Sequence, residues 1–192
     1  MDIEKMLFVQ SVKKSNDNNK WIIHFIIGVI MYCLIGIINS YMQNGKIEFL
    51  SSLVIAIFNV TFSILIIFLI ILTISKIMKS ETKVAIIFSS SVFIMLCLTV
   101  FNGIVTIVQS MFSLDTSEYS IISLNIFNSN IPELAAFNLI NLLFPYLVWV
   151  VLYTVSKLTL KSSIIWAILV GIVNLAIDLL VIQLVEVLKT LM

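Results

Sequence analysis

The feature that most constrains this chain is a series of five long apolar runs. A helix needs about 20 apolar residues to cross the hydrocarbon core of a bilayer. Of the 192 residues, 61% are hydrophobic and 11% are charged, whereas a soluble domain has about 45–50% and about 25%. The sequence therefore predicts one all-α, polytopic membrane domain, residues 21–192, built as a bundle of five transmembrane helices. The predicted spans cover residues 21–41, 49–74, 84–112, 132–156 and 163–188.

Residues 1–20 are polar and form a separate N-terminal segment in this interpretation. The apolar run that follows is too long for a signal peptide, and no small-residue cleavage pattern follows it, so it is expected to remain as a transmembrane helix. Two interpretations of the first 20 residues stay open. One is a loosely ordered tail. The other is a short amphipathic helix on the membrane surface, with Ile3, Met6, Leu7 and Val12 on its apolar face.

The distribution of lysine predicts the orientation. All eleven basic residues are lysines, and nine of them precede the first run or lie in the second and fourth connections. Cytoplasmic loops carry an excess of lysine and arginine, so the N-terminus is expected in the cytoplasm and the C-terminus outside. The lack of arginine, with abundant isoleucine, asparagine and lysine, is typical of an AT-rich genome. We therefore expect a multi-pass protein of a bacterial plasma membrane.

The longest connection, residues 113–131, contains no lysine. Its middle, residues 119–127, is partly apolar and is expected to lie flat at the membrane interface. At its end, Asn130 is followed by Pro132 in the first turn and by Glu133 three residues after the cap. This is the pattern of a helix start, so the fourth span is predicted to begin here.

Polar residues inside the fourth and fifth runs form the candidate site. Asp178 is the one deep carboxylate, about 24 Å from the inner end of its predicted helix, and intramembrane carboxylates are candidates for function. In an antiparallel hairpin of these two runs, residues whose numbers sum to about 319 lie at equal depth. This pairs Asn141 with Asp178 and Pro145 with Asn174. Asn138 lies one turn before Asn141. Pro145 leaves the main-chain carbonyl of Asn141 in need of a donor, which a protonated Asp178 or the Asn174 amide is expected to supply.

These polar residues have two interpretations. In the first, they form hydrogen bonds that hold the two helices together, as such groups do in membranes. In the second, Asp178 binds an ion, a proton or a polar group of a partner. The sequence leaves both open.

Known catalytic and metal-binding patterns are not found in the sequence. There is no HExxH, GxSxG or Walker motif, and His24 is the single histidine. Cys33 and Cys97 lie far apart in apolar runs and are expected to be buried thiols. A net charge of +1 gives no basic surface for nucleic acid. We therefore expect no enzyme activity, no catalytic residue, no metal, no cofactor and no nucleic-acid partner.

Two stretches resemble the Yip (Ypt/Rab-interacting protein) family of polytopic membrane proteins, and its bacterial branch in particular. Residues 136–172, AFNLINLLFPYLVWVVLYTVSKLTLKSSIIWAILVGI, are similar to the region where a helix leads through a short Ser/Lys turn into the last span. Residues 74–94, ISKIMKSETKVAIIFSSSVFI, resemble the basic loop after the second span and the small-residue-rich helix that follows. Five spans with an inner N-terminus and an outer C-terminus also resemble the family.

The resemblance implies a non-enzymatic integral membrane protein that acts through helix or loop contacts. The implied partner is another membrane protein, such as an ABC exporter, or a second copy of the chain, with a role in envelope stress or toxin resistance. The alternative comes from the residues themselves: a small transporter or substrate-binding membrane subunit. It would use the polar cluster of the fourth and fifth runs, because transporters place broken helices beside polar sites.

Overall fold

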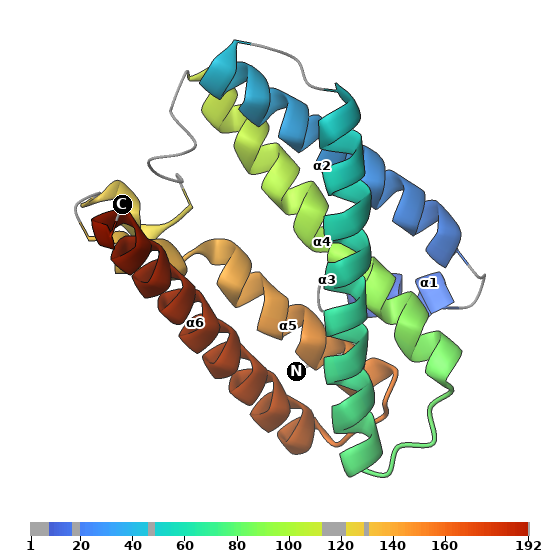
Figure 1. Cartoon of the computed structure of the whole chain (residues 1–192). Coiled ribbons are helices and arrows are strands. Elements are labelled where there is room, and N and C mark those ends of the chain that lie inside the picture. Colours follow the sequence, from blue (N-terminus) through green and yellow to red (C-terminus); the bar gives the residue numbers. More distant parts are fainter. Residues whose placement is uncertain (1–7, 17–19, 46–48, 113–121, 129–130, 192) are drawn as a thin grey trace.

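The computed structural model of the chain describes residues 8–16, 20–45, 49–112, 122–128 and 131–191, and these form helices joined by short loops (Figure 1). In the described part, the extended backbone pairs only at one isolated bridge, between Ser123 and Asn138. In chain order the helices are α1 (Val9–Asn16), α2 (Trp21–Asn44), α3 (Phe49–Ile77), α4 (Val84–Met111), the short 3-10 helices η2 (Leu124–Ile126) and η3 (Pro132–Ala136), α5 (Leu139–Thr154) and α6 (Leu160–Leu191).

Four of these helices, α2, α3, α4 and α6, are long and apolar enough to cross a membrane. They confirm four of the predicted spans, and the last begins at Leu160, three residues earlier than predicted. α2 ends at Gly45, whose φ of 63° is a left-handed conformation that glycine adopts readily. The chain is therefore an all-helical protein with the composition of a multi-pass membrane protein.

The prediction of one continuous helix over residues 132–156 was wrong. The segment consists of η3 and then α5, a separate apolar helix of 16 residues, which is about 24 Å long at 1.5 Å per residue. Between them, Phe137 and Asn138 leave the helical region, with ψ angles of 73° and 160°. The break occurs because the Asn138 side chain accepts the main-chain N–H of Asn141 at 2.9 Å, and this cap begins a new helix.

The segment around Ser123 folds back on this break and satisfies its backbone. Leu124 N–H donates to the Phe137 carbonyl, and Leu139 N–H donates to the Ile122 carbonyl, both at 3.1 Å. Irregular backbone within a membrane protein needs such partners. Part of the segment predicted to lie flat at the interface is thus paired with the helix break, while residues 119–121 lie outside the described part of the chain.

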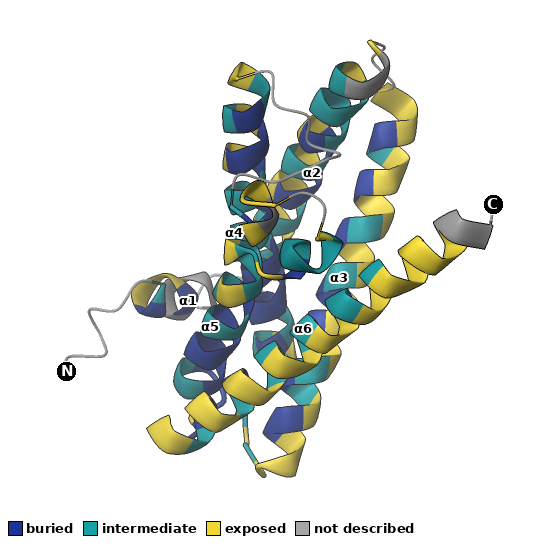
Figure 2. Ribbon diagram, turned by 90° about the vertical axis from the view of Figure 1, so that its left-hand side faces the viewer, coloured by how far each residue is buried: buried dark blue, intermediate teal, exposed yellow. Residues whose placement is uncertain are grey.

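The packing core lies where α5 meets α3 and α4, and α2 packs against α3 and α4 on their other side (Figure 1). α6 lies at the edge. It packs mainly against α5 and η3, and most of its length is exposed (Figure 2). The largest fully buried side chains of the core include Ile71, Ile87, Ile94, Leu147 and Leu152.

The N-terminal segment contains a helix, α1, that packs on the bundle. Val9 and Val12 are buried, and the ring of Phe8 meets that of Phe93 edge-on at 6.5 Å. α1 contacts α4 and α5, so its apolar face is used within the protein. Ile3, Met6 and Leu7, which were assigned to an amphipathic face, lie outside the described residues.

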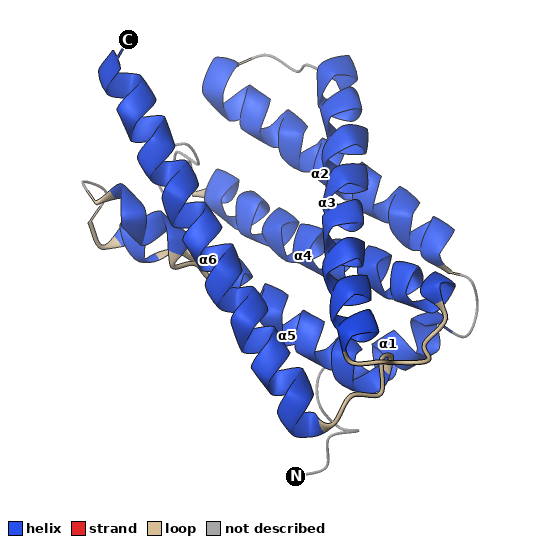
Figure 3. Ribbon diagram, turned by 60° about the horizontal axis from the view of Figure 1, so that its bottom comes forward, coloured by secondary structure: helices blue, strands red, loops and turns tan. Residues whose placement is uncertain are grey.

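The loops after α3 and α5 lie at the same end of the bundle and are joined by hydrogen bonds (Figure 3). The hydroxyls of Ser75 and Ser156 are 2.7 Å apart and buried. Thr82 Oγ1 donates to the Val155 carbonyl at 2.8 Å, and Ser80 Oγ donates to the Ser156 carbonyl at 2.8 Å. The two lysine-containing loops therefore share one end of the bundle.

Replacing Ser75 by alanine is expected to lower the free energy of unfolding by about 1 kcal/mol, because it leaves the buried Ser156 hydroxyl without this partner. Thermal unfolding in detergent would measure the loss. The double variant Ser75→Ala/Ser156→Ala removes both polar groups, so it should lose less than the sum of the single variants. Strict additivity would show that the two hydroxyls do not interact.

Candidate polar site between α5 and α6

The candidate site is centred on Asn141, whose side-chain amide joins both helices. Its Nδ2 donates to Asp178 Oδ2 at 2.6 Å and to the Ala136 carbonyl at 2.7 Å. Asn174 Nδ2 donates to Asn141 Oδ1 at 3.3 Å and lies 3.5 Å from Asp178 Oδ2. The predicted contact of Asn141 with Asp178 is therefore present, and Asn174 completes a three-residue cluster of half-buried side chains.

The fold explains why these residues meet. Asn174 and Asp178 are four residues apart, and so lie on one face of α6. α5 and α6 form an antiparallel hairpin (Figure 1), which brings the first turn of α5 to the level of Asp178. Asn141 lies in that first turn, where its side chain reaches both α6 and the carbonyl that ends η3.

Asn138 has a different role from the other predicted site residues. It is the N-cap of α5: its Oδ1 accepts from the N–H of Asn141 at 2.9 Å, and its Nδ2 donates to the Ala135 carbonyl at 3.1 Å. The predicted cap, Asn130, lies outside the described residues. Asn138 therefore positions Asn141 instead of contacting Asp178.

Replacing Asn138 by alanine is expected to lower the free energy of unfolding by about 1 kcal/mol, the usual value of an N-cap. Asn138→Ser retains a cap acceptor and should recover most of the loss. Thermal unfolding of both variants in the same detergent would measure this difference. Equal unfolding temperatures for the alanine and serine variants would contradict the capping role.

Pro145 packs against Gly171, three residues before the predicted partner Asn174. A Cβ placed on Gly171 would lie 3.2 Å from both Cβ and Cγ of the proline ring, so the two helices approach closely here. The Asn174 amide donates to the side-chain oxygen of Asn141, whereas the sequence predicted the main-chain carbonyl as acceptor. Pro145 thus shapes the helix contact next to the polar cluster.

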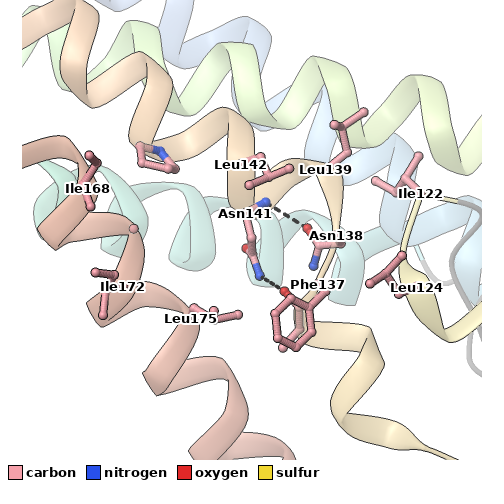
Figure 4. A pocket seen from close by; sticks show the side chains of 13 residues that line it. Ile122, Leu124, Phe137, Asn138, Leu139, Asn141, Leu142, Ile168, Ile172 and Leu175 are labelled. Carbon is pink, nitrogen blue, oxygen red and sulfur yellow. Dashed lines mark hydrogen bonds between the residues drawn. The ribbon is translucent and has the colours of Figure 1, made fainter. Parts of the chain in front are cut away.

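Three cavities adjoin α6 around this cluster. The polar pocket, of about 340 Å³, is bounded by η3, α5 and α6 and includes Asp178. The side groove, of about 470 Å³, runs along α5 and α6 from Asn141 toward Ile168 (Figure 4). The α3–α6 cleft, of about 450 Å³, lies on another face of α6 and includes Asn174. The cluster therefore borders all three cavities.

Asp178 has no ion-pair partner among the residues that the structure describes. Both amide contacts end on its Oδ2 atom, and Oδ1 accepts from no described group. The described residues also contain no group of three His, Cys, Asp or Glu side chains suited to a metal ion. The site is thus one carboxylate held by neutral amides.

The remaining candidates lie elsewhere. The ring of His24 meets that of Phe93 edge-on at 5.8 Å, away from the polar cluster. Cys33 is a buried free thiol, as predicted, and Cys97 is a half-buried one. Neither approaches the candidate site.

Comparison with known protein families, curated proteins and solved structures finds no match for this chain.

Two contributors to the site were missed from the sequence. Gly171 was not considered, although it is nearly level with Pro145 in the hairpin numbering and is one of only five glycines in the chain. The Ala136 carbonyl was missed because it becomes available only where the helix breaks. Asn138, a residue type favoured at helix N-caps, was the signal for that break.

Proposed function

We propose that this protein is a non-enzymatic integral membrane protein of the Yip type that binds a transmembrane helix of a partner in the α3–α6 cleft. The observation that supports this most is the position of α6, which packs mainly on α5 and η3 and leaves the cleft toward α3 open. The cleft is almost entirely apolar but includes the amide of Asn174 and the hydroxyl of Thr73. Apolar packing and interhelical hydrogen bonds are what associate helices in membranes.

The proposed partner class follows from the family resemblance. A partner such as an ABC exporter, or a second copy of this chain, would place one helix along Leu69 of α3 and Val173 of α6. The proposed setting is a bacterial plasma membrane with the lysine-rich loops in the cytoplasm. The proposed role is support of export, envelope stress tolerance or toxin resistance.

Affinity purification from native membranes in mild detergent tests this proposal. Val173 lines the cleft and is exposed, so Val173→Trp should fill the cleft and remove a stoichiometric partner seen with the wild type. Ile164→Trp places the same side chain at an exposed position on the opposite face of the same helix, nine residues or two and a half turns from Val173 and outside the lining of the cleft, and should retain the partner. Equal recovery with both variants would contradict a partner in the cleft.

The second candidate function is a small transporter or substrate-binding membrane subunit that uses the polar cluster. One observation favours it: the helix break at Phe137–Asn138 lies beside an intramembrane carboxylate, an arrangement that transporters use to bind substrates. A transport or resistance phenotype would then be lost in Asp178→Asn. An intact phenotype in that variant would reject this candidate.

A further inference from the structure

The polar pocket and the side groove are neighbouring cavities with opposite chemistry. Ala136, Asn138 and Asn141 line both of them. The polar pocket contains the Asp178 carboxylate. The side groove continues along α6 between Leu175 and Ile168, which is about 10 Å, or two turns. Together they form a cavity that is anionic at one end and apolar along the other.

The carboxylate lacks a positive partner in the described part of the chain. Asn141 and Asn174 approach only Oδ2 of Asp178, and both are neutral amides. An ionised group within a membrane protein is normally paired with an opposite charge. A ligand with a positive headgroup would complement Asp178, and a hydrogen-bonding ammonium would fit its Oδ1 oxygen.

The position of the cavity indicates where the ligand comes from. Asp178 is 18 residues after Leu160, the first residue of α6, so it lies about 27 Å along the helix. This is close to the thickness of the hydrocarbon core, about 30 Å. Leu142 and Ile172 line the groove and are 69% and 60% exposed, so the groove opens sideways toward the bilayer. Its ligand can enter from the lipid phase.

We infer that this cavity binds a phospholipid with a primary ammonium headgroup, such as phosphatidylethanolamine. The ammonium pairs with Asp178 in the polar pocket, and one acyl chain lies in the side groove along Leu142 and Ile172. A trimethylammonium headgroup cannot donate a hydrogen bond to the carboxylate, and a glycerol headgroup has no positive charge. The site therefore favours phosphatidylethanolamine over phosphatidylcholine and phosphatidylglycerol. This inference does not depend on the proposed partner, which occupies a different face of α6.

Native mass spectrometry of the purified chain tests the inference directly. The protein is exchanged into detergent with equal amounts of phosphatidylethanolamine and phosphatidylglycerol of matched chains. We expect the wild type to retain phosphatidylethanolamine preferentially, and Asp178→Asn to reduce this preference about tenfold, the scale of one hydrogen bond to a charged group. Asparagine is nearly isosteric and can still bond to Asn141, and thermal unfolding of the variant checks that it folds.

Glu186→Gln is the matched control, because it removes one carboxylate from an exposed position of the same helix and should leave the preference unchanged. No preference in the wild type, or the same preference in Asp178→Asn, would overturn the inference. An equimolar amount of dodecylamine should displace little phosphatidylethanolamine, since it lacks the second chain and the phosphate. Complete displacement would overturn the assignment to a phospholipid.

The lipid and partner proposals fail separately. Lipid selectivity is measured on the isolated chain and depends on Asp178, whereas partner recovery is measured from native membranes and depends on Val173. If one of these two experiments gives the expected result and the other does not, the failed experiment identifies the proposal that is wrong.

Discussion

Replacing Asn141 by leucine should destabilise the protein more than any other single change at the polar cluster. We expect the free energy of unfolding to fall by about 3 kcal/mol. The Asn141 side chain takes part in three hydrogen bonds, with Ala136, Asp178 and Asn174, and each interhelical bond in a membrane protein contributes about 0.6 kcal/mol on average and up to about 1.7 kcal/mol. Asp178 also loses its nearest donor, and an unsatisfied charged group adds to the cost.

Asn59→Leu is the matched control for this prediction. Asn59 is also an intramembrane amide, but its side chain makes a single bond in the described structure, from Nδ2 to the Tyr32 hydroxyl at 3.3 Å. Its replacement should cost about 1 kcal/mol or less. Thermal or denaturant unfolding of both variants in the same detergent measures the difference. Equal destabilisation would contradict the central position of Asn141 in the hairpin.

Replacing Gly171 by alanine should have the second largest effect, a loss of about 2 kcal/mol. The added Cβ would lie 3.2 Å from two atoms of the Pro145 ring, which is rigid and cannot rotate away. α5 and α6 would have to move apart, and overpacking of this kind costs about 1–3 kcal/mol. The movement would also lengthen the contact of Asn141 with Asp178, which lie about one turn from Pro145 along α5 and about two turns from Gly171 along α6.

Gly28→Ala provides the control for the Gly171 variant. Both changes gain the same helix propensity, but a Cβ on Gly28 meets only the Val60 side chain, at 3.9 Å, an ordinary contact. A second test combines Gly171→Ala with Pro145→Ala, which removes the Cγ contact but keeps the Cβ contact, and should restore part of the lost stability. If Gly28→Ala were as destabilising as Gly171→Ala, the contact with Pro145 would not explain the loss.

The helical architecture could be predicted from the sequence because lipid requires long apolar helices. Four predicted spans are helices in the structure. The contact of Asn141 with Asp178 was predicted by counting residues in both directions from the turn between the fourth and fifth spans. Such a prediction depends only on chain length and on the constant rise of a helix.

The break within the fourth span was missed because apolar composition continues through it. Residues 132–156 are apolar enough for one helix, yet the cap formed by Asn138 competes with helix continuation. The contact that stabilises the break comes from Ser123 and its neighbours, which are distant in sequence. The side groove could not be predicted, because its shape depends on how side chains of different helices pack, and the hydrophobic periodicity of the sequence does not determine that packing.

Site-specific photocrosslinking in native membranes tests the central claim of a partner helix beside α6. A photoreactive amino acid at Val173, within the α3–α6 cleft, should give one discrete protein adduct. The same group at Ile164, an exposed position on the opposite face of the same helix that does not line the cleft, should give none. Adducts of equal yield at both positions, or only lipid adducts at Val173, would contradict the proposed function.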